Sequence, residues 1–263
     1  KKIKMLNKLL NIFYNYIKYN RKFQIHLKKI KNEEYNIKNV TKLSFKKIIK
    51  ILKKKIKKNG ITKNDKYKIF ALIKKAAKKT LYVNVYDTQL YGGWLLLEKN
   101  IIEMKTGEGK TLTAVFAAIT NYMTGEKTHI ATTNDYLAKR DAEWMNPLYK
   151  FIGIKVAYII SNMKINEKKT SYKKDIIYGT CSEFVFDYLK NNIIIEKKYY
   201  IKIKFNSLII DEIDSILIDE AQTPLIIADK EKRNLKNDKK LYILINTITK
   251  NLIHFSNTLI NKQ

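Results

Sequence analysis

A glycine-rich segment in the first half of the chain ends in Gly-Lys-Thr and has the composition of a phosphate-binding loop. Backbone N–H groups of such a loop, together with the positive end of the helix that follows it, bind phosphate oxygens. The lysine of such a loop reaches the outer phosphates, and the threonine hydroxyl binds Mg²⁺. The residues that we expect to hold the phosphates are Thr106, Gly107, Glu108, Gly109, Lys110 and Thr111.

A second segment that can do chemistry follows the apolar residues Leu208–Ile210 and has the sequence Asp-Glu-Ile-Asp. Its first carboxylate can hold the Mg²⁺ shell, and the second can polarise a water for attack on a γ-phosphate. Such an acidic cluster also occurs at helix N-termini, where the helix dipole favours it. The loop and the acidic pair together favour a nucleoside-triphosphate motor that uses ATP and Mg²⁺. The predicted catalytic residues are Lys110, Asp211 and Glu212, and the predicted Mg²⁺ ligands are Thr111 and Asp211.

Gln89 lies upstream of the phosphate-binding loop, in a segment that we expect to be a loop over residues 86–93. A side-chain amide offers a donor and an acceptor at once, which suits the edge of an adenine base. A glutamine in a loop is more often simply solvated. Its position before the phosphate-binding loop favours adenine recognition, so Gln89 is the predicted base-binding residue.

Helix and strand patterns alternate from Asp65 onward. The elements that they predict must position the phosphate-binding loop and the acidic pair. The predicted strands span residues 128–133, 154–160, 175–178 and 205–210. The predicted helices span 66–82, the stretch from the phosphate-binding loop to 122, which Gly125 closes, the stretch that Asn134 caps, 182–191 and 241–253. This order indicates an α/β fold with a mostly parallel sheet, and the nucleotide is expected at the carboxyl ends of its strands.

The composition is strongly basic, with a formal net charge of +29, and almost all of the positive charge is lysine. An A+T-rich genome would produce this lysine bias by drift. The alternative interpretation is attraction to phosphates or to anionic lipid. The charge therefore supports an anionic partner without identifying one. The single cysteine, Cys181, excludes a disulfide framework and indicates a reducing compartment. No apolar run approaches the roughly 20 residues that span a bilayer, and no secretory signal is present at the N-terminus.

Residues 1 to about 80 are rich in lysine, and their pattern predicts helices. Apolar residues recur at spacings of three and four, at Ile3, Leu6, Leu10, Phe13 and Ile17. This stripe fits either a helix packed on the domain surface or an interfacial helix on acidic lipid. The chain begins with Lys1 rather than methionine and ends without a closing element, so we expect it to be a fragment.

Five segments resemble SecA, the family of ATPases that drive preproteins through the Sec translocon. The phosphate-binding loop looks like that of the family, including Met104 where the generic pattern has glycine. The most specific segment extends from the acidic pair into a stem that general DExD helicases lack. The similar segments are Glu103–Thr113, Thr133–Asp141, Tyr178–Thr180, Phe186–Leu189 and Ile210–Ile227. The chain departs from the family pattern at Val85, Gln222 and Asp229.

The resemblance implies a RecA-like P-loop NTPase domain of the DEAD type, with an N-terminal helical extension. It implies three regions: a helical region at 1–82, the first nucleotide-binding domain at 83–228, and a linker at 229–263 that begins the preprotein-binding domain. It also implies that Gln89 takes the adenine and that the loop residues hold the phosphates and Mg²⁺.

The expected partners follow from the same resemblance: a Sec channel of the SecY/SecE type, preproteins and an anionic membrane surface. The resemblance also admits a homodimer. The expected location is the plastid stroma and the thylakoid surface, or alternatively the bacterial cytoplasm and inner membrane. Nucleic acid is not an expected partner, because aromatic residues interleaved with arginine are lacking.

The family closes its ATP site with arginines from a second RecA-like domain, and an arginine finger contributes roughly 10³–10⁵ in rate. We therefore expect the chain alone to bind ATP–Mg²⁺ weakly and to hydrolyse it negligibly. Two alternatives stay open at this point: a DExD-box helicase that acts on RNA or DNA, and a truncated fragment that only binds.

Overall fold

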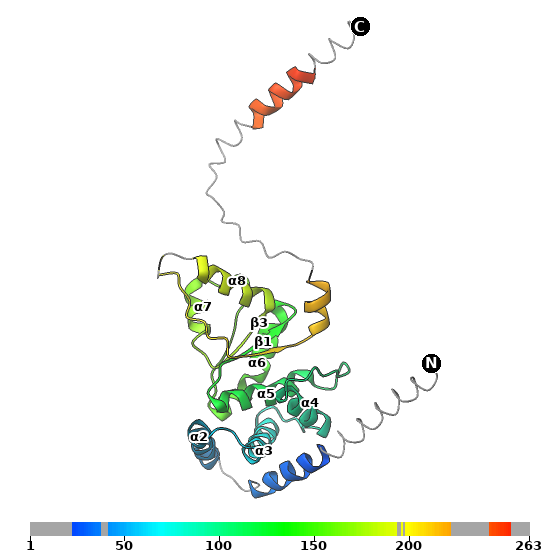
Figure 1. Ribbon diagram of the computed structural model, residues 1–263, viewed down its shortest axis with the longest axis vertical. Coiled ribbons are helices and arrows are strands. Elements are labelled where there is room, and N and C mark those ends of the chain that lie inside the picture. Colours follow the sequence, from blue (N-terminus) through cyan, green and yellow to red (C-terminus); the bar gives the residue numbers. More distant parts are fainter. Residues whose placement is uncertain (1–22, 38–41, 194–195, 197, 222–241, 254–263) are drawn as a thin grey trace, which may run out of the picture. The chain divides into compact units, whose positions relative to one another are not determined.

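The computed structural model describes residues 23–37, 42–193, 196, 198–221 and 242–253 (Figure 1). The chain divides into two compact units, Lys1–Pro224 and Leu225–Gln263. The predicted stripe from Ile3 to Ile17 and the stem beyond residue 221 lie outside the described residues. Within the described residues, no helix is long and apolar enough to cross a bilayer. The predicted region boundaries at 82 and 228 stay predictions.

The first unit is built on a parallel sheet of four strands in the order β2-β3-β1-β4. The strands are β1 (Thr128–Thr132), β2 (Val156–Tyr158), β3 (Ile176–Thr180) and β4 (Ser207–Ile210). Thr128 of β1 lies opposite Ile176 of β3 and Ser207 of β4, so all three strands start at one edge. The predicted parallel sheet is confirmed, and each strand overlaps its predicted range.

Helices cover both faces of the sheet (Figure 1). The helices α5 (Lys110–Thr124) and α6 (Asp135–Ile152) share one apolar core with alternate strand residues such as Ile130. The helices α7 (Ile165–Ser171) and α8 (Cys181–Ile193) flank the other face, where Ala131 joins a second, smaller core. Successive strand residues point to opposite faces, so β1 and β3, which are buried at every position, contribute side chains to both cores.

The N-terminal helices belong to the same core as the sheet. The helices α2 (Lys42–Asn59) and α3 (Lys63–Thr80) contribute Phe45, Leu52 and Phe70 to the core that α5 and α6 share. The structure starts α3 before the predicted position, because Thr62 and Asp65 form a capping box. The backbone N–H of Asp65 donates to the Thr62 hydroxyl at 3.2 Å, and the N–H of Thr62 donates to the Asp65 carboxylate at 3.0 Å.

The predicted loop over residues 86–93 is wrong, because these residues form most of helix α4 (Asp87–Leu97). Gly92 and Gly93 lie within the predicted loop, and in the structure they allow α4 to approach α5 closely. A Cβ on Gly92 would lie 2.7 Å from Thr113, and one on Gly93 would lie 2.7 Å from Phe116. The two glycines are therefore needed for helix packing.

Two predicted helix-end signals are confirmed. The α5 helix ends at Gly125, whose φ of +95° places it in the left-handed region that favours glycine. Asn134 caps α6, because its side-chain oxygen accepts a hydrogen bond of 2.9 Å from the backbone N–H of Leu137. These ends set the points at which the chain turns between helix and strand.

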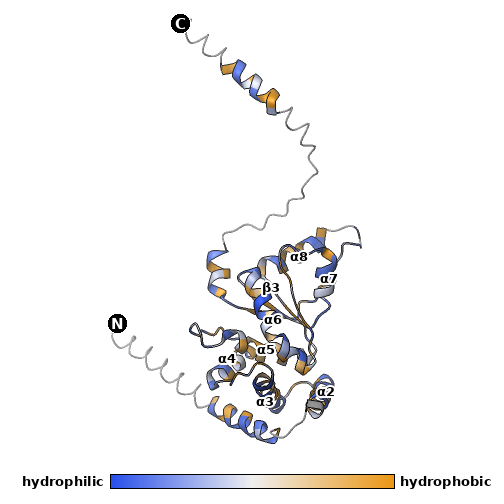
Figure 2. Cartoon of the chain, turned by 180° about the vertical axis from the view of Figure 1, so that it is seen from behind, coloured by the Kyte–Doolittle hydropathy of each residue, from blue (hydrophilic) through white to orange (hydrophobic). Residues whose placement is uncertain are grey.

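The second unit contains a described helix over residues 242–253, which matches the helical segment predicted there. Figure 2 shows hydrophobic residues along this helix. Its large apolar side chains are exposed, for example Ile243 and Leu252. Within its own described residues, this unit buries no core.

Candidate nucleotide-binding site

The phosphate-binding loop is a tight turn in front of α5. Gly107 and Gly109 both have a φ of +87°, a conformation that other residues rarely adopt. The backbone N–H of Lys105 donates to the Glu108 side chain at 3.0 Å, and the N–H of Glu108 donates to the Lys105 carbonyl at 3.2 Å. The turn leaves Thr106, Gly107 and Glu108 exposed at the surface of the molecule.

The helix that follows presents its N-terminus to this loop. Gly109 is the N-cap of α5, and Lys110 and Thr111 are its first two residues. The first N–H groups of a helix have no partner within the helix, and the helix dipole places positive charge at this end. The predicted phosphate-binding residues therefore converge on one exposed helix N-terminus.

The side chain of Gln89, in α4, forms a hydrogen bond with the phosphate-binding loop. Its Nε2 donates to the carbonyl of Glu108 at 2.9 Å, and its Oε1 accepts from the backbone N–H of Tyr86 at 3.1 Å. The side chain is buried, and a Cβ on Gly109 would lie 2.2 Å from its Nε2. The amide keeps one N–H and one lone pair beyond these two bonds. Its predicted contact with adenine stays a prediction.

The acidic pair stands at the carboxyl end of β4. The backbone N–H of Asp211 donates to the carbonyl of Ala131 at 2.9 Å, which extends the strand pairing with β1 by one residue. Glu212 has a φ of +54°, which is uncommon for a residue with a side chain. The Thr133 hydroxyl donates to the Glu212 carboxylate at 3.1 Å. A strained backbone held by a neighbouring side chain is typical of functional positions.

Lys110 and both carboxylates line one cavity of about 330 Å³, together with Met104 and Thr113. Burial and the adjacent Glu212 raise the pKa of Asp211 above its ordinary value, while the Lys110 ammonium lowers it. The structure thus brings the predicted lysine and the predicted acidic pair together, although they come from different elements.

The two predicted Mg²⁺ ligands carry suitable donor atoms, and of the two Asp211 lines this cavity. Thr111 offers a hydroxyl and Asp211 a carboxylate, and both are the oxygen donors that Mg²⁺ prefers. In the part of the chain that the structure describes, no group of three His, Cys, Asp or Glu residues could hold a metal alone. One hydroxyl and one carboxylate suit Mg²⁺, which is bound through one or two carboxylates together with water and substrate phosphates.

The structure adds residues that the prediction of catalytic and binding residues did not include. Thr133 contacts Glu212, and Asp141 of α6 lies near Thr111, whose hydroxyl is 3.5 Å from the Asp141 carboxylate. Both residues belong to the segment Thr133–Asp141, which carries part of the family resemblance. Their partners could not be assigned from the sequence, because the contacts join elements far apart along the chain.

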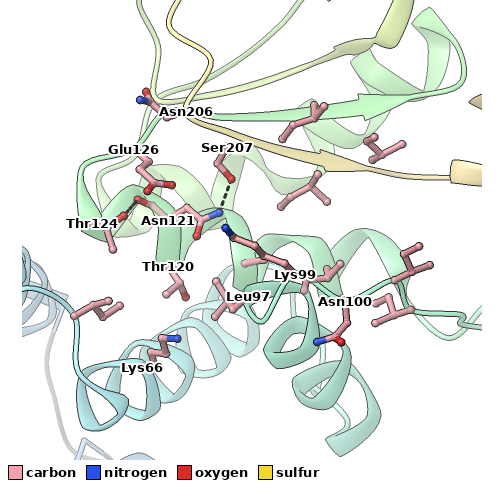
Figure 3. A pocket seen from close by; sticks show the side chains of 18 of the residues that line it. Lys66, Leu97, Lys99, Asn100, Thr120, Asn121, Thr124, Glu126, Asn206 and Ser207 are labelled. Atoms are coloured by element: carbon pink, nitrogen blue, oxygen red, sulfur yellow. Dashed lines mark hydrogen bonds between the residues drawn. The ribbon is translucent and has the colours of Figure 1, made fainter.

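A second cavity, of about 630 Å³, lies beside β4 and the residues Ile101 and Ile102, which belong to no strand (Figure 3). Asn121 donates to the Ser207 hydroxyl at 2.6 Å on its wall. Neither Lys110 nor the acidic pair lines this cavity. It nevertheless adjoins the cavity of Lys110 and the acidic pair, because Leu96, Ile102 and Ile209 line both.

The model of the SecA DEAD-like domain matches residues 10–256. The chain belongs to the SecA DEAD-like domain family. Among proteins similar to this SecA-family chain, the protein translocase subunit SecA of Clostridium botulinum (strain Okra / Type B1) is 48% identical over 184 residues, or 70% of this chain. The protein translocase subunit SecA 2 of Clostridioides difficile (strain 630) is 42% identical over 230 residues, or 88% of this chain. The resemblance predicted from the sequence is confirmed.

The SecA-family chain spans 22% of the first of these curated relatives and 29% of the second. A solved structure of a hypothetical ATP-dependent RNA helicase from Sulfolobus tokodaii aligns with a TM-score of 0.43 and 22% identity, over 57% of this chain and 43% of that chain. The family match and the parallel sheet flanked by helices confirm the predicted RecA-like α/β fold.

Proposed function

We propose that this chain is the first nucleotide-binding half of a preprotein translocase motor, which couples ATP hydrolysis to the movement of preproteins across a membrane. The observation that carries the proposal is the shared cavity of Lys110, Asp211 and Glu212 at the N-terminus of α5. A motor needs this convergence, because the lysine and the carboxylates must act on one triphosphate. Family membership adds the translocase context.

Each residue of the site has a proposed task. The N–H groups of Gly107, Gly109 and the first turn of α5 bind phosphate oxygens, and Lys110 reaches the outer phosphates. Thr111 and Asp211 hold Mg²⁺, which when bound neutralises charge on the phosphates. Glu212, oriented by Thr133, takes the proton of the attacking water.

The base of the nucleotide is proposed to bind near Gln89. The amide already bonds to the loop carbonyl of Glu108. Its remaining N–H and lone pair can face an adenine edge. Adenine recognition and loop position are then coupled through one side chain.

The proposed partners are those of a translocase: a Sec channel, preproteins and an anionic membrane surface. The relatives named above come from bacteria. The lysine-rich composition fits an A+T-rich genome, so the proposed locations are the plastid stroma with the thylakoid surface, or the bacterial cytoplasm with the inner membrane.

Nucleotide binding by the chain is the first test. Titration with a fluorescent ATP analogue and Mg²⁺ should show saturable, weak binding, and Lys110→Ala should abolish it. Lys105→Ala is the matched control, because Lys105 lies in the same loop and is exposed. The control should bind as the unchanged chain does. Equal binding by Lys110→Ala and the unchanged chain would refute the proposal.

The second test concerns the motor. The chain alone should hydrolyse ATP negligibly, because the second RecA-like domain supplies the arginines. A chimera that joins this chain to the remaining domains of the Clostridium botulinum relative should regain ATPase activity that membranes and preprotein stimulate. Stimulation by RNA instead would favour a helicase.

A further inference from the structure

Arginine is rare in this chain, and the position of Arg140 indicates a specific role for its side chain. The chain has 53 lysine and arginine residues, and almost all of them are lysine. The three arginines are Arg21, Arg140 and Arg233. Of these three, Arg140 is the one that the structure describes. A position that keeps arginine against this bias points to a need for the guanidinium group itself, which differs from an ammonium in shape and in its number of donors.

The geometry shows what the guanidinium does. The Nε and Nη2 of Arg140 lie 2.8 Å and 2.7 Å from the same oxygen, Oδ1 of Asp141. The Asp141 side chain is 4% exposed, whereas that of Arg140 is 46% exposed. A lysine offers one nitrogen at the end of a flexible chain and cannot make this two-point contact. The guanidinium therefore fixes the orientation of a buried carboxylate.

The second oxygen of this carboxylate faces the phosphate site. Oδ2 of Asp141 lies 3.5 Å from the hydroxyl oxygen of Thr111. A hydroxyl has one hydrogen and two lone pairs. When Thr111 donates its hydrogen to Asp141, its lone pairs are left for a cation. Each oxygen of Asp141 thus has its own task, one toward Arg140 and one toward Thr111.

We propose that Arg140 and Asp141 are positioning residues for magnesium: the guanidinium orients the carboxylate, and the carboxylate directs the Thr111 lone pairs toward the ion. This inference rests on the proposed function, because it assigns Mg²⁺ to Thr111. It goes beyond that function by adding a chain of contacts from the surface of α6 to the metal ligand. Residues that orient metal ligands commonly influence metal affinity strongly.

A purely structural role for Asp141 makes a different prediction. Asp141 could simply tie α6 to α5, in which case its loss would weaken nucleotide binding with and without metal. A positioning role weakens binding only when Mg²⁺ is present. The comparison of affinities in Mg²⁺ and in EDTA therefore separates the two roles.

The experiment measures the affinity of the chain for a fluorescent ATP analogue in both conditions. Asp141→Asn should lower the affinity about tenfold in Mg²⁺ and leave it unchanged in EDTA, because an amide has a single oxygen and cannot accept from both neighbours. Arg140→Lys should act in the same direction. It also serves as the second variant if Asp141→Asn fails to fold, since Arg140 is exposed.

The matched controls lie on the same helix. Glu143→Gln and Lys139→Ala remove exposed charges of α6 and should match the unchanged chain in both conditions. In a chain that already carries Thr111→Val, adding Asp141→Asn should cause no further loss. Equal losses in Mg²⁺ and EDTA, or full additivity with Thr111→Val, would overturn the positioning role while the proposed function stands. Absence of nucleotide binding by the unchanged chain would overturn both.

Discussion

The Thr133 hydroxyl donates a hydrogen bond of 3.1 Å to the Glu212 carboxylate and so joins the ends of two neighbouring strands. Thr133 is the first residue after β1, and Glu212 is the second residue after β4. Parallel strands bring their carboxyl ends to one edge of a sheet, and the pairing of β1 with β4 brings these two residues together. The contact holds a backbone conformation that Glu212 would otherwise rarely adopt.

We expect Thr133→Val to slow ATP hydrolysis without weakening ATP binding, because it releases Glu212 but leaves the phosphate-binding loop intact. Misplacement of a catalytic group by about 1 Å costs roughly 10²-fold in rate. The measurement is the turnover rate of the chimera with the remaining SecA domains. Thr133→Ser keeps the hydroxyl and should retain most of the rate. A loss of the same size in both variants would contradict the role of the hydrogen bond.

We expect Gly109→Ala to weaken nucleotide binding more than Gly107→Ala does. Both glycines have a φ of +87°, so either alanine brings backbone strain, about 1–2 kcal/mol. Only at Gly109 would the new Cβ meet Gln89, whereas a Cβ at Gly107 meets nothing within 4 Å. The difference between the two variants, measured by nucleotide titration, isolates the contact with Gln89. Equal effects would show that this contact is unimportant.

We expect the chain to lose stability as the pH falls from about 6.5 toward 4, and His129→Leu to reduce this loss. Burial and the charge of Lys127 lower the pKa of His129 to about 4. In the unfolded chain the imidazole titrates near 6.5, so the unfolded state binds more protons between these values and stability rises with pH there. The full effect is on the order of 3 kcal/mol.

Urea unfolding at pH 7.5 and pH 5 measures this dependence. His129 is fully buried among aromatic rings that include Phe184 and Phe205, so a leucine replaces it without introducing a buried charge. The difference in unfolding free energy between the two pH values should be smaller in His129→Leu. An unchanged difference would show that another group controls the acid sensitivity.

Local signals in the sequence were sufficient for much of the fold. The four strands were predicted from short segments between the helical patterns, most of them rich in apolar residues, as expected for strands in a sheet covered by helices. Gly125 and Asn134 predicted helix ends, because left-handed backbone and side-chain capping are properties of single residues. The phosphate-binding loop was recognisable for the same reason.

Other features depended on neighbours that are distant in the chain. Gly92 and Gly93 fall within the predicted loop over residues 86–93, yet they lie in α4, where their lack of a side chain allows packing against α5. A glycine in a turn and a glycine at a close helix crossing look alike in a sequence. Only the position of Phe116 and Thr113 distinguishes them.

The sequence by itself determined which residue types could bind phosphate and Mg²⁺, because that capacity belongs to the side chains and the loop. Only the tertiary structure decided that Lys110 and Asp211 share a cavity, that Thr133 holds Glu212, and that a carboxylate on α6 approaches Thr111. These relationships arise from parallel strand pairing and from helix packing on the sheet. Both bring together residues whose separation along the chain carries no information about their distance in space.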